Sequence, residues 1–391
     1  MGLETALVTN IATARAAAYT GILPCQAIRD MVASGDIRPA EILTDIETDQ
    51  IQPASIDLRL GHFAYPVDTS FLPGSGVSVM EKMQQLDERF EDFKIDLRNG
   101  AVLEKGRVYV IPLLEAIRLK SEIAAFANPK SSTGRLDILT RLIADHATIF
   151  DQVENGYEGQ LYIEVAPKSF SIVAKTGTRL NQLRFRRTRG EAPKPITAAD
   201  WKQLLDEGQV TSRKVSDKTG ILPFTVDLKG SGEDGALIGW RAKKHTRRID
   251  LERRDYDPLD FWEPIRFHKE ASLILDPDEF YILMTKEAIA VPPDYAAEMV
   301  PYDTRAGEFR VHYAGFFDPG FGWNKGRAGS SRGVLEVRSH EVPFLLEHGQ
   351  TVGWLRYERM AAKPDVLYGQ DIKSNYQGQS LKLAKQFRNI I

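Results

Sequence analysis

The chain has 391 residues, more than one ordinary hydrophobic core accommodates, so we predict two domains. Its composition, 42% hydrophobic and 27% charged, is that of a folded protein, and a net charge of −3 argues against a protein that coats nucleic acid. The single cysteine, Cys25, excludes an intrachain disulfide framework and a cysteine-rich zinc site, and it fits a reducing compartment. No apolar run of about 18 residues and no basic, apolar leader is present, so we expect no membrane partner, no signal peptide and a cytoplasmic location.

The chain repeats one plan, with its landmarks returning in the same order about 170 residues later. CQAIRDMVASGDI predicts a short amphipathic helix closed by Gly35, and AADWKQLLDEGQV predicts a second helix closed by Gly208. The other landmarks pair as IQPASIDLRLG (51–61) with ILPFTVDLKG (221–230), VYVIPLLEAI (108–117) with FYILMTKEAI (280–289), HATIFD (146–151) with YAGFFD (313–318), and GQLYIEV (159–165) with GVLEV (333–337).

Between these helices the patterns are short strands of β-branched and aromatic residues, interrupted by Gly, Pro and Asp. We therefore predict a mainly β protein of two tandem barrels or sandwiches with a few short helices. A Pro-rich polar stretch marks the join, which gives a first domain over residues 1–190 and a second over 191–365. Residues 366–391 form a tail with no counterpart in the first copy, either a loose end or a lid.

Two features of the first copy suggest a polyphosphate site. The turn from Ser131 to Arg135 offers three hydroxyls and, with Lys130, two cations, which suit phosphate oxygens. A serine-rich surface turn is, however, the commoner meaning of such a pattern. Glu164 stands in a strand among apolar neighbours, where partial burial would raise its pKa and suit it to proton transfer. A solvated strand face is the usual place for such a glutamate. Glu336 fills the same slot in the second copy.

The segments IQPASIDLRLG, PKSSTGRL (129–136), GYEGQLYIEV (156–165), GTRLNQLRF (177–185) and YGQDIKSNYQGQ (368–379) together resemble the dCTP deaminase family. That family belongs to the trimeric dUTPase-like superfamily, and the whole chain looks like its long form, in which two dUTPase-like β-barrels are fused. The resemblance implies a hydrolase that converts dCTP to dUTP and ammonia, for dUMP and dTTP supply. It also implies dCTP and dUTP as partners, no nucleic acid, and a homotrimer of two-barrel chains.

The resemblance carries site roles over by position. Glu164 would activate water for attack on cytosine C4 and then protonate the leaving ammonia, assisted by Ser131 and Arg135. The residues expected to bind the nucleotide are Lys130, Ser132, Ala147, Thr148, Asp151, Gln182, Tyr368, Lys373 and Gln379. In the second copy the serine slot holds no hydroxyl, so we interpret its own site as degenerate. Candidate residues there are Glu336, the alternative catalytic acid, with Arg305 and Asp318.

The resemblance further implies Mg²⁺ bound through the triphosphate, with few protein ligands. We expect no zinc, because zinc-dependent cytidine deaminases need a pair of cysteines. Three alternatives stay open: a dUTPase, a bifunctional enzyme that makes dUMP directly, and a nucleotide-binding regulator without activity. Glu164, Ser131 and Arg135 favour the deaminase.

Overall fold

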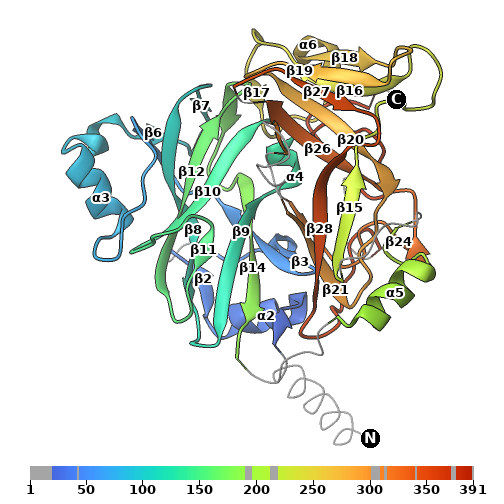
Figure 1. Cartoon of the computed structure of the whole chain (residues 1–391). Helices are drawn as coiled ribbons and strands as arrows, with labels where there is room; N and C mark the ends of the chain where they lie inside the picture. Colours follow the sequence, from blue (N-terminus) through green and yellow to red (C-terminus); the bar gives the residue numbers. More distant parts are fainter. Residues whose placement is uncertain are drawn as a thin grey trace, which may run out of the picture.

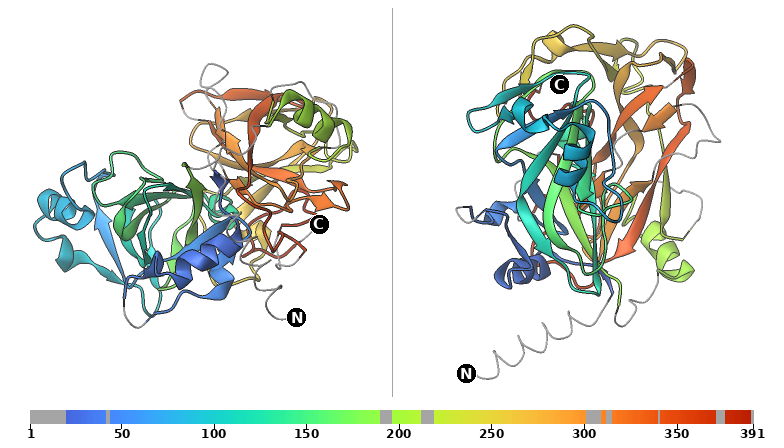
Figure 2. Two further views of the ribbon diagram at one scale, coloured as in Figure 1. Left: turned by 90° about the horizontal axis from the view of Figure 1, so that it is seen from below. Right: turned by 90° about the vertical axis from the view of Figure 1, so that its left-hand side faces the viewer.

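In the computed structural model the chain forms two β-rich halves that lie against each other (Figures 1 and 2). The mainly β architecture, the two-domain form and the scarcity of helix confirm the prediction. The structure describes residues 20–41, 44–189, 196–211, 219–300, 309–311, 315–339, 341–370 and 376–389.

The first half consists of two main antiparallel sheets and a small third one. The first sheet runs in the order β11 (Gln152–Val153), β9 (Ile123–Pro129), β14 (Arg179–Arg187), β4 (Ser55–Arg59) and β3 (Ile51–Gln52), with β1 (Gly21–Ile22) beside β14. The second runs β10 (Ile138–Ala144), β12 (Glu158–Pro167), β8 (Val108–Arg118), β5 (Phe63–Val67) and β6 (Ile95–Asp96), with β2 (Ile37–Pro39) beside β8. The third contains β7 (Ala101–Leu103) and β13 (Ile172–Ala174).

The second half follows the same strand order. One sheet runs β23 (Phe316–Phe317), β21 (Tyr295–Val300), β28 (Thr351–Arg359) and β15 (Ile221–Thr225). The other runs β22 (Phe309–Val311), β26 (Arg332–Ser339), β20 (Phe280–Ala288), β16 (Leu237–Ala242) and β18 (Trp262–Arg266). Two hairpins complete it, β19 (Ser272–Leu275) with β27 (Phe344–Glu347) and β24 (Trp323–Asn324) with β25 (Arg327–Ala328).

Strand register places the two repeated glutamates in equivalent positions. Glu164 on β12 lies opposite Val110 on β8. Glu336 on β26 lies opposite Ile282 on β20. Glu336 follows Glu164 in the sequence by the same number of residues as Ile282 follows Val110. Each glutamate therefore occupies the same place in the sheet of its own half.

Both predicted amphipathic helices are present. They are α2 (Cys25–Ala33) and α5 (Ala198–Asp206), and the glycines after them, Gly35 and Gly208, have φ of 75° and 66°. This left-handed conformation ends a helix at little cost only for glycine. The remaining short helices are α3 (Val79–Leu86), α4 (Ser131–Gly134), α6 (Pro258–Phe261), η1 (Thr48–Gln50) and η2 (Phe90–Phe93).

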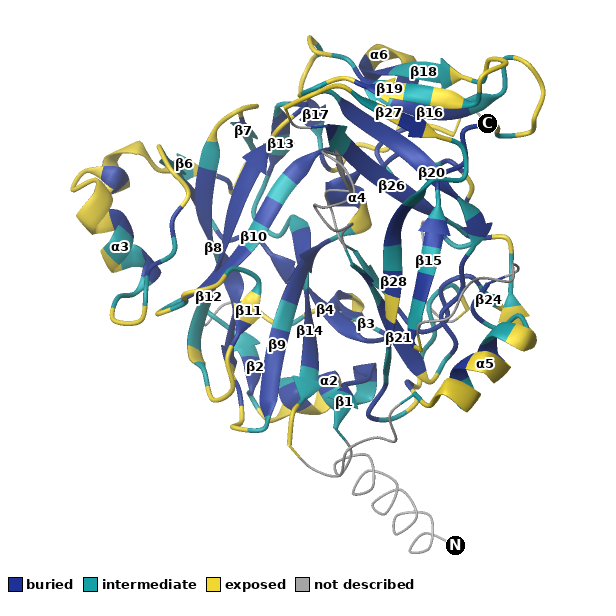
Figure 3. Ribbon diagram, viewed as in Figure 1, coloured by how far each residue is buried: buried dark blue, intermediate teal, exposed yellow. Residues whose placement is uncertain are grey.

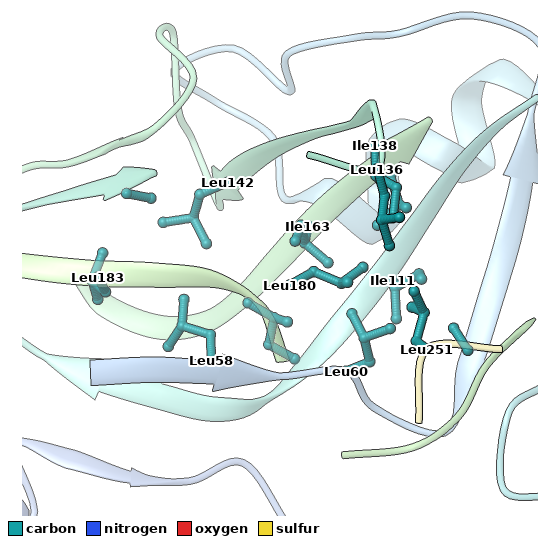
Figure 4. Close-up of a cluster of buried hydrophobic side chains, with 14 of the residues drawn as sticks. Leu58, Leu60, Ile111, Leu136, Ile138, Leu142, Ile163, Leu180, Leu183 and Leu251 are labelled. Carbon is teal, nitrogen blue, oxygen red and sulfur yellow. The ribbon is translucent and has the colours of Figure 1, made fainter. Parts of the chain in front are cut away.

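The hydrophobic core of the first half extends into a segment of the second. Strand β17 (Ile249–Asp250) pairs in parallel with β13 of the first half. Leu251, just after it, packs among leucines and isoleucines of the first barrel such as Leu60 and Ile111 (Figure 4). The facing strands of the two halves are largely buried (Figure 3). The halves therefore share apolar packing across their interface.

Ion pairs also join the two halves. The guanidinium of Arg184 on β14 lies 3.0 Å from the Asp318 carboxylate, and both side chains are buried. The guanidinium of Arg186 lies 2.6 Å from the Glu358 carboxylate. Breaking a buried pair by removing one partner leaves an uncompensated charge, so these contacts fix how one half sits on the other.

In the part of the chain that the structure describes, no helix has both the length and the apolar character needed to cross a membrane.

Removing the Leu251 side chain should destabilise the protein although this residue belongs to the second half. Leu251→Ala leaves a cavity in the core of the first half, and we expect the free energy of unfolding to fall by about 2–5 kcal/mol. Leu259→Ala is the matched control because Leu259 is 50% exposed, and its effect should stay within about 0.5 kcal/mol. Chemical denaturation measures both, and equal effects would contradict the shared core.

Candidate active site

A cavity of about 160 Å³ lies between the two halves. Most of the residues predicted for the nucleotide site line it: Lys130, Ser131, Ser132, Arg135, Gln182, Asp318, Glu336, Tyr368 and Gln379. The first half supplies the serine-rich turn, the second half supplies Glu336 and Asp318, and the tail supplies Tyr368 and Gln379. The cavity is therefore a composite of three parts of one chain.

The turn is held rigidly against β14. The backbone amide of Lys130 and the hydroxyl of Thr133 both donate to the carbonyl of Leu180, at 2.9 and 2.7 Å. The turn coils into the single helical turn α4, whose first residue, Ser131, is exposed at the cavity. The ammonium of Lys130 is paired with the buried carboxylate of Asp57. This support fixes a hydroxyl and a cation at the cavity wall.

Arg135 connects the turn with the other two parts. Its guanidinium is buried, and it donates to the side-chain oxygen of Gln379 and to the carbonyl of Lys382, both at 2.9 Å. The ring of Tyr376 lies with its centroid 3.9 Å from the guanidinium carbon. The Nε atom of Arg135 lies 3.8 Å from Oε1 of Glu336. The tail therefore binds to Arg135, the same side chain that faces Glu336 of the second half.

Glu336 is the titratable group at the centre of this arrangement. Its side chain is buried at 4% exposure, and burial raises its pKa to about 7, although the charge of Arg135 acts in the opposite direction. A carboxyl group with a pKa near the working pH can both accept and return a proton. The second half therefore places in the cavity the glutamate that the sequence offered as the alternative catalytic acid.

The second half also supplies an aromatic wall. Phe316, Phe317 and Phe321 line the cavity, with the Phe317 and Phe321 rings edge to face at 5.0 Å between centroids. Arg184 from the first half lies over the Phe316 ring, 4.0 Å from its centroid, and pairs with Asp318. Sequence reasoning missed these phenylalanines, although the paired aromatics of YAGFFD were the available signal.

Glu164 does not line the cavity of the Ser131 turn within this chain. Arg141 lies opposite it in the β10–β12 register, and its guanidinium is 2.7 Å from Oε1 of Glu164. Arg141 also donates to the hydroxyl of Ser70 at 3.0 Å and lies over the Phe150 ring. Glu164 is 1% exposed and does not line the cavity. Its carboxylate is thus neutralised within its own half.

The predicted base-reading residues of the first half are likewise elsewhere. Ala147 and Thr148 line a separate cavity formed by their own hairpin. Asp151 has a φ of 61°, and its carboxylate accepts from the amide of Leu142 at 2.7 Å, which holds the hairpin closed. The matching hairpin of the second half reaches the Ser131 cavity instead, through Asp318 and its neighbours. Arg305 and Lys373 lie outside the described residues.

Within the described ranges, no three His, Cys, Asp or Glu side chains are grouped to hold a metal ion. Of the two cavity carboxylates, that of Asp318 is engaged by Arg184 and that of Glu336 faces Arg135. This donor set suits an ion that takes most of its ligands from phosphate and water. The Mg²⁺ and zinc expectations stay predictions.

These features define a two-domain, mainly β protein with a composite cavity, lined by cations, hydroxyls and carboxylates, at its domain interface. The N-terminal-domain model of 2'-deoxycytidine 5'-triphosphate deaminase matches residues 19–189, and the C-terminal-domain model matches residues 197–387. A crystal structure of 2'-deoxycytidine 5'-triphosphate deaminase from Agrobacterium tumefaciens is 49% identical. It superposes with a TM-score of 0.80 over 87% of this chain and 99% of that one. The chain belongs to the dCTP deaminase family.

Curated relatives match about half of the chain. A dCTP deaminase of Halorubrum lacusprofundi is 28% identical over 192 residues, which is 49% of this chain and 89% of that protein. A dUMP-forming dCTP deaminase of Methanobrevibacter smithii is 25% identical over 185 residues, 46% of this chain and 88% of that protein. Relatives named dCTP deaminase and relatives named dUMP-forming dCTP deaminase are therefore both found.

The buried position of Glu336 predicts a pH-dependent stability. Because its pKa is raised to about 7, the folded protein keeps a proton that the unfolded chain releases above its ordinary pKa of 4.5. The free energy of unfolding should therefore fall as pH rises from about 4.5 to about 7, by a contribution on the order of 3 kcal/mol. Glu336→Gln should remove this contribution and make the slope shallower, while Asp151, whose pKa burial also raises to about 7, keeps its own share.

Denaturation midpoints of the wild type and the Glu336→Gln variant between pH 4.5 and 8 test this expectation. Glu347→Gln, on an exposed strand position, is the control and should keep the slope of the wild type. Parallel curves for the wild type and Glu336→Gln would show that Glu336 has no raised pKa.

Proposed function

We propose that this chain deaminates dCTP to dUTP and ammonia in the cavity between its two halves, with Glu336 as the proton-transferring group. The observation that carries the proposal is the meeting of Glu336 from one half with Arg135 and the Ser131 turn from the other. Family membership supports the reaction, and the position of Glu336 supports the assignment of roles.

The reaction needs a base and then an acid at one place. As a carboxylate, Glu336 takes a proton from water while the water oxygen bonds to cytosine C4. As a carboxylic acid, it gives that proton to ring N3; it then takes the proton of the new C4 hydroxyl and delivers it to the exocyclic nitrogen, so that the C4–N bond breaks and ammonia leaves as the C4 carbonyl forms. A pKa of about 7 keeps both forms populated near neutral pH. Arg135, 3.8 Å from the carboxylate, limits this rise in pKa and orients the group.

In this proposal the aromatic wall of the second half binds the base of the nucleotide, and the turn of the first half binds its phosphates. The aromatic wall of the second half gives apolar faces on which a pyrimidine ring can stack, and Asp318 adds a polar group beside them. The turn of the first half gives the hydroxyls of Ser131 and Ser132 and the cation of Lys130 for phosphate oxygens. Tyr368 and Gln379 of the tail close the remaining side.

Mg²⁺ would enter with the triphosphate and neutralise part of its charge, with no ligand assigned to this chain. Zinc-activated water is not part of the proposal, because the chain has one cysteine where the zinc deaminases use a pair, and Cys25 is buried. The resulting role is dUTP production for dUMP and dTTP supply. The homotrimer and the cytoplasmic location predicted from the sequence are part of the same proposal.

A dUMP-forming reaction is the second candidate, because relatives with that name match the chain over a similar length. It would add hydrolysis of the triphosphate in the same cavity. Incubation with dCTP, followed by measurement of ammonia, dUTP, dUMP and pyrophosphate, separates the two. We expect ammonia and dUTP in equal amounts. Ammonia with dUMP and pyrophosphate would establish the second candidate, and no ammonia would refute deamination.

The pair of equivalent glutamates provides a matched test of the assignment. Glu336→Gln should lower kcat for dCTP by about 100- to 10,000-fold, the usual contribution of general acid–base catalysis, while dCTP still binds. Glu164→Gln should retain turnover, because Glu164 pairs with Arg141 away from the cavity. Steady-state ammonia release and calorimetric dCTP binding measure both effects. Loss of turnover in Glu164→Gln alone would transfer the role to the first half.

A further inference from the structure

Three cations line the cavity, and among the described residues one of them has no carboxylate partner. Lys130 is paired with Asp57, and Arg135 faces Glu336 while its guanidinium donates to the tail. Lys385 is the third. Its ammonium has no carboxylate within ion-pair distance in the described part of the chain, and the carboxylate that acts on it, Asp57, already belongs to Lys130.

Lys385 is held in place by its neighbours in sequence. The side chain of Gln386 donates to the carbonyl of Leu251 at 3.0 Å, and the Gln386 carbonyl accepts from the amide of Tyr256 at 3.1 Å. Phe387 packs edge to face against Phe261, 5.5 Å between ring centroids. Lys385 is therefore a half-buried side chain on an anchored segment, not a mobile surface lysine.

The surroundings of Lys385 are positive. Burial lowers its pKa to about 8, and Arg254, Lys130 and Arg179 act in the same direction against the single opposing effect of Asp57. An ammonium kept among cations in a partly buried place is stabilised when an anion binds there.

Lys385 also lies between two cavities. It lines the Glu336 cavity and, together with Ser132, an adjoining cavity of about 410 Å³. Arg254, Thr176 and Thr178 line this second cavity. Glu252 and Arg179 line it too, but Glu252 is paired with Lys175 and Arg179 with Asp49, so Arg254 and Lys385 are the cations left to meet phosphate oxygens. A chain of phosphates that starts at the Ser131 turn can therefore continue past Ser132 and Lys385 toward Arg254.

We propose that Lys385 binds the terminal phosphates of the nucleotide and that the adjoining cavity, with Arg254, receives the end of the triphosphate. The inference rests on the proposed function of the Glu336 cavity. It makes Lys385 a specificity-determining residue: it distinguishes dCTP from dCMP, whose single phosphate ends at the Ser131 turn.

Direct binding to a variant that does not turn over tests the assignment. In the Glu336→Gln background, calorimetry with dCTP and dCMP should show that Lys385→Met raises the Kd for dCTP by about 10- to 100-fold, the effect of losing one hydrogen bond to a charged group. The Kd for dCMP should change little, and Lys385→Arg should restore dCTP binding. Arg254→Met, at an exposed position, should also weaken dCTP binding selectively.

Lys363→Met is the control for the loss of one positive charge, because Lys363 is exposed and lines neither cavity. Its Kd for dCTP should equal that of the Glu336→Gln parent. If Lys385→Met weakens dCTP and dCMP equally, or neither, the assignment of Lys385 is wrong. Absence of ammonia from dCTP with the wild-type protein would refute the proposed function instead, so the two failures are distinguishable.

A pH series gives a readout that a purely structural lysine would not move. Because the ammonium of Lys385 has a pKa of about 8, it loses its charge as pH rises through that value. The Kd for dCTP should therefore increase between about pH 7 and 9.5 with lysine at this position, and it should increase less with Lys385→Arg, which stays charged. Identical pH profiles would contradict the contact between Lys385 and phosphate.

Discussion

The guanidinium of Arg135 connects the three parts of the chain that form the cavity. It leaves the turn of the first half, lies 3.8 Å from the carboxylate of the second half, and donates two hydrogen bonds to the tail. Because the group is buried, each of its donors needs a partner, and the tail supplies two of them. The contacts of Arg135 therefore hold the tail, Glu336 and the Ser131 turn together. The interdomain pair of Arg184 with Asp318 fixes the same interface from the adjacent strand.

The two halves have the same strand order but place their glutamates in different surroundings. The first copy keeps the serine-rich turn, while its glutamate is neutralised by Arg141. The second copy keeps a glutamate whose pKa is raised by burial, and its hairpin brings aromatic side chains and Asp318 to the cavity. Equivalent positions in the sheets therefore carry unequal environments. Arg141 lies 2.7 Å from Glu164, whereas the guanidinium nearest to Glu336 among the described residues, that of Arg135, lies at 3.8 Å.

Local signals in the sequence predicted the helices and turns correctly, but they did not predict which of these elements contact each other in the folded chain. Gly35 and Gly208 marked the ends of two helices correctly, and the turn at Ser131 lies at a cavity as its hydroxyls and cations suggested. The repeat in the sequence showed which residues of the two copies are equivalent. It did not show which residues of one copy contact residues of the other. The resemblance grouped Glu164 with Arg135 and kept Glu336 as the alternative acid, and within this chain Glu336 is the glutamate that faces Arg135. Lys385 was missed because the position of its side chain depends on the docking of Gln386 and Phe387 on a distant segment.

Because both walls of the cavity belong to one polypeptide, their encounter is an intramolecular event. Covalent connection sets their effective concentration through the chain that joins them, and not through the amount of protein in solution. Within a chain, the Ser131 turn and Glu336 then stay opposite each other at any dilution, held by Arg184, Arg186 and the packing of Leu251. Because the two barrels are covalently joined, the two walls of this cavity stay together whether or not the subunits associate.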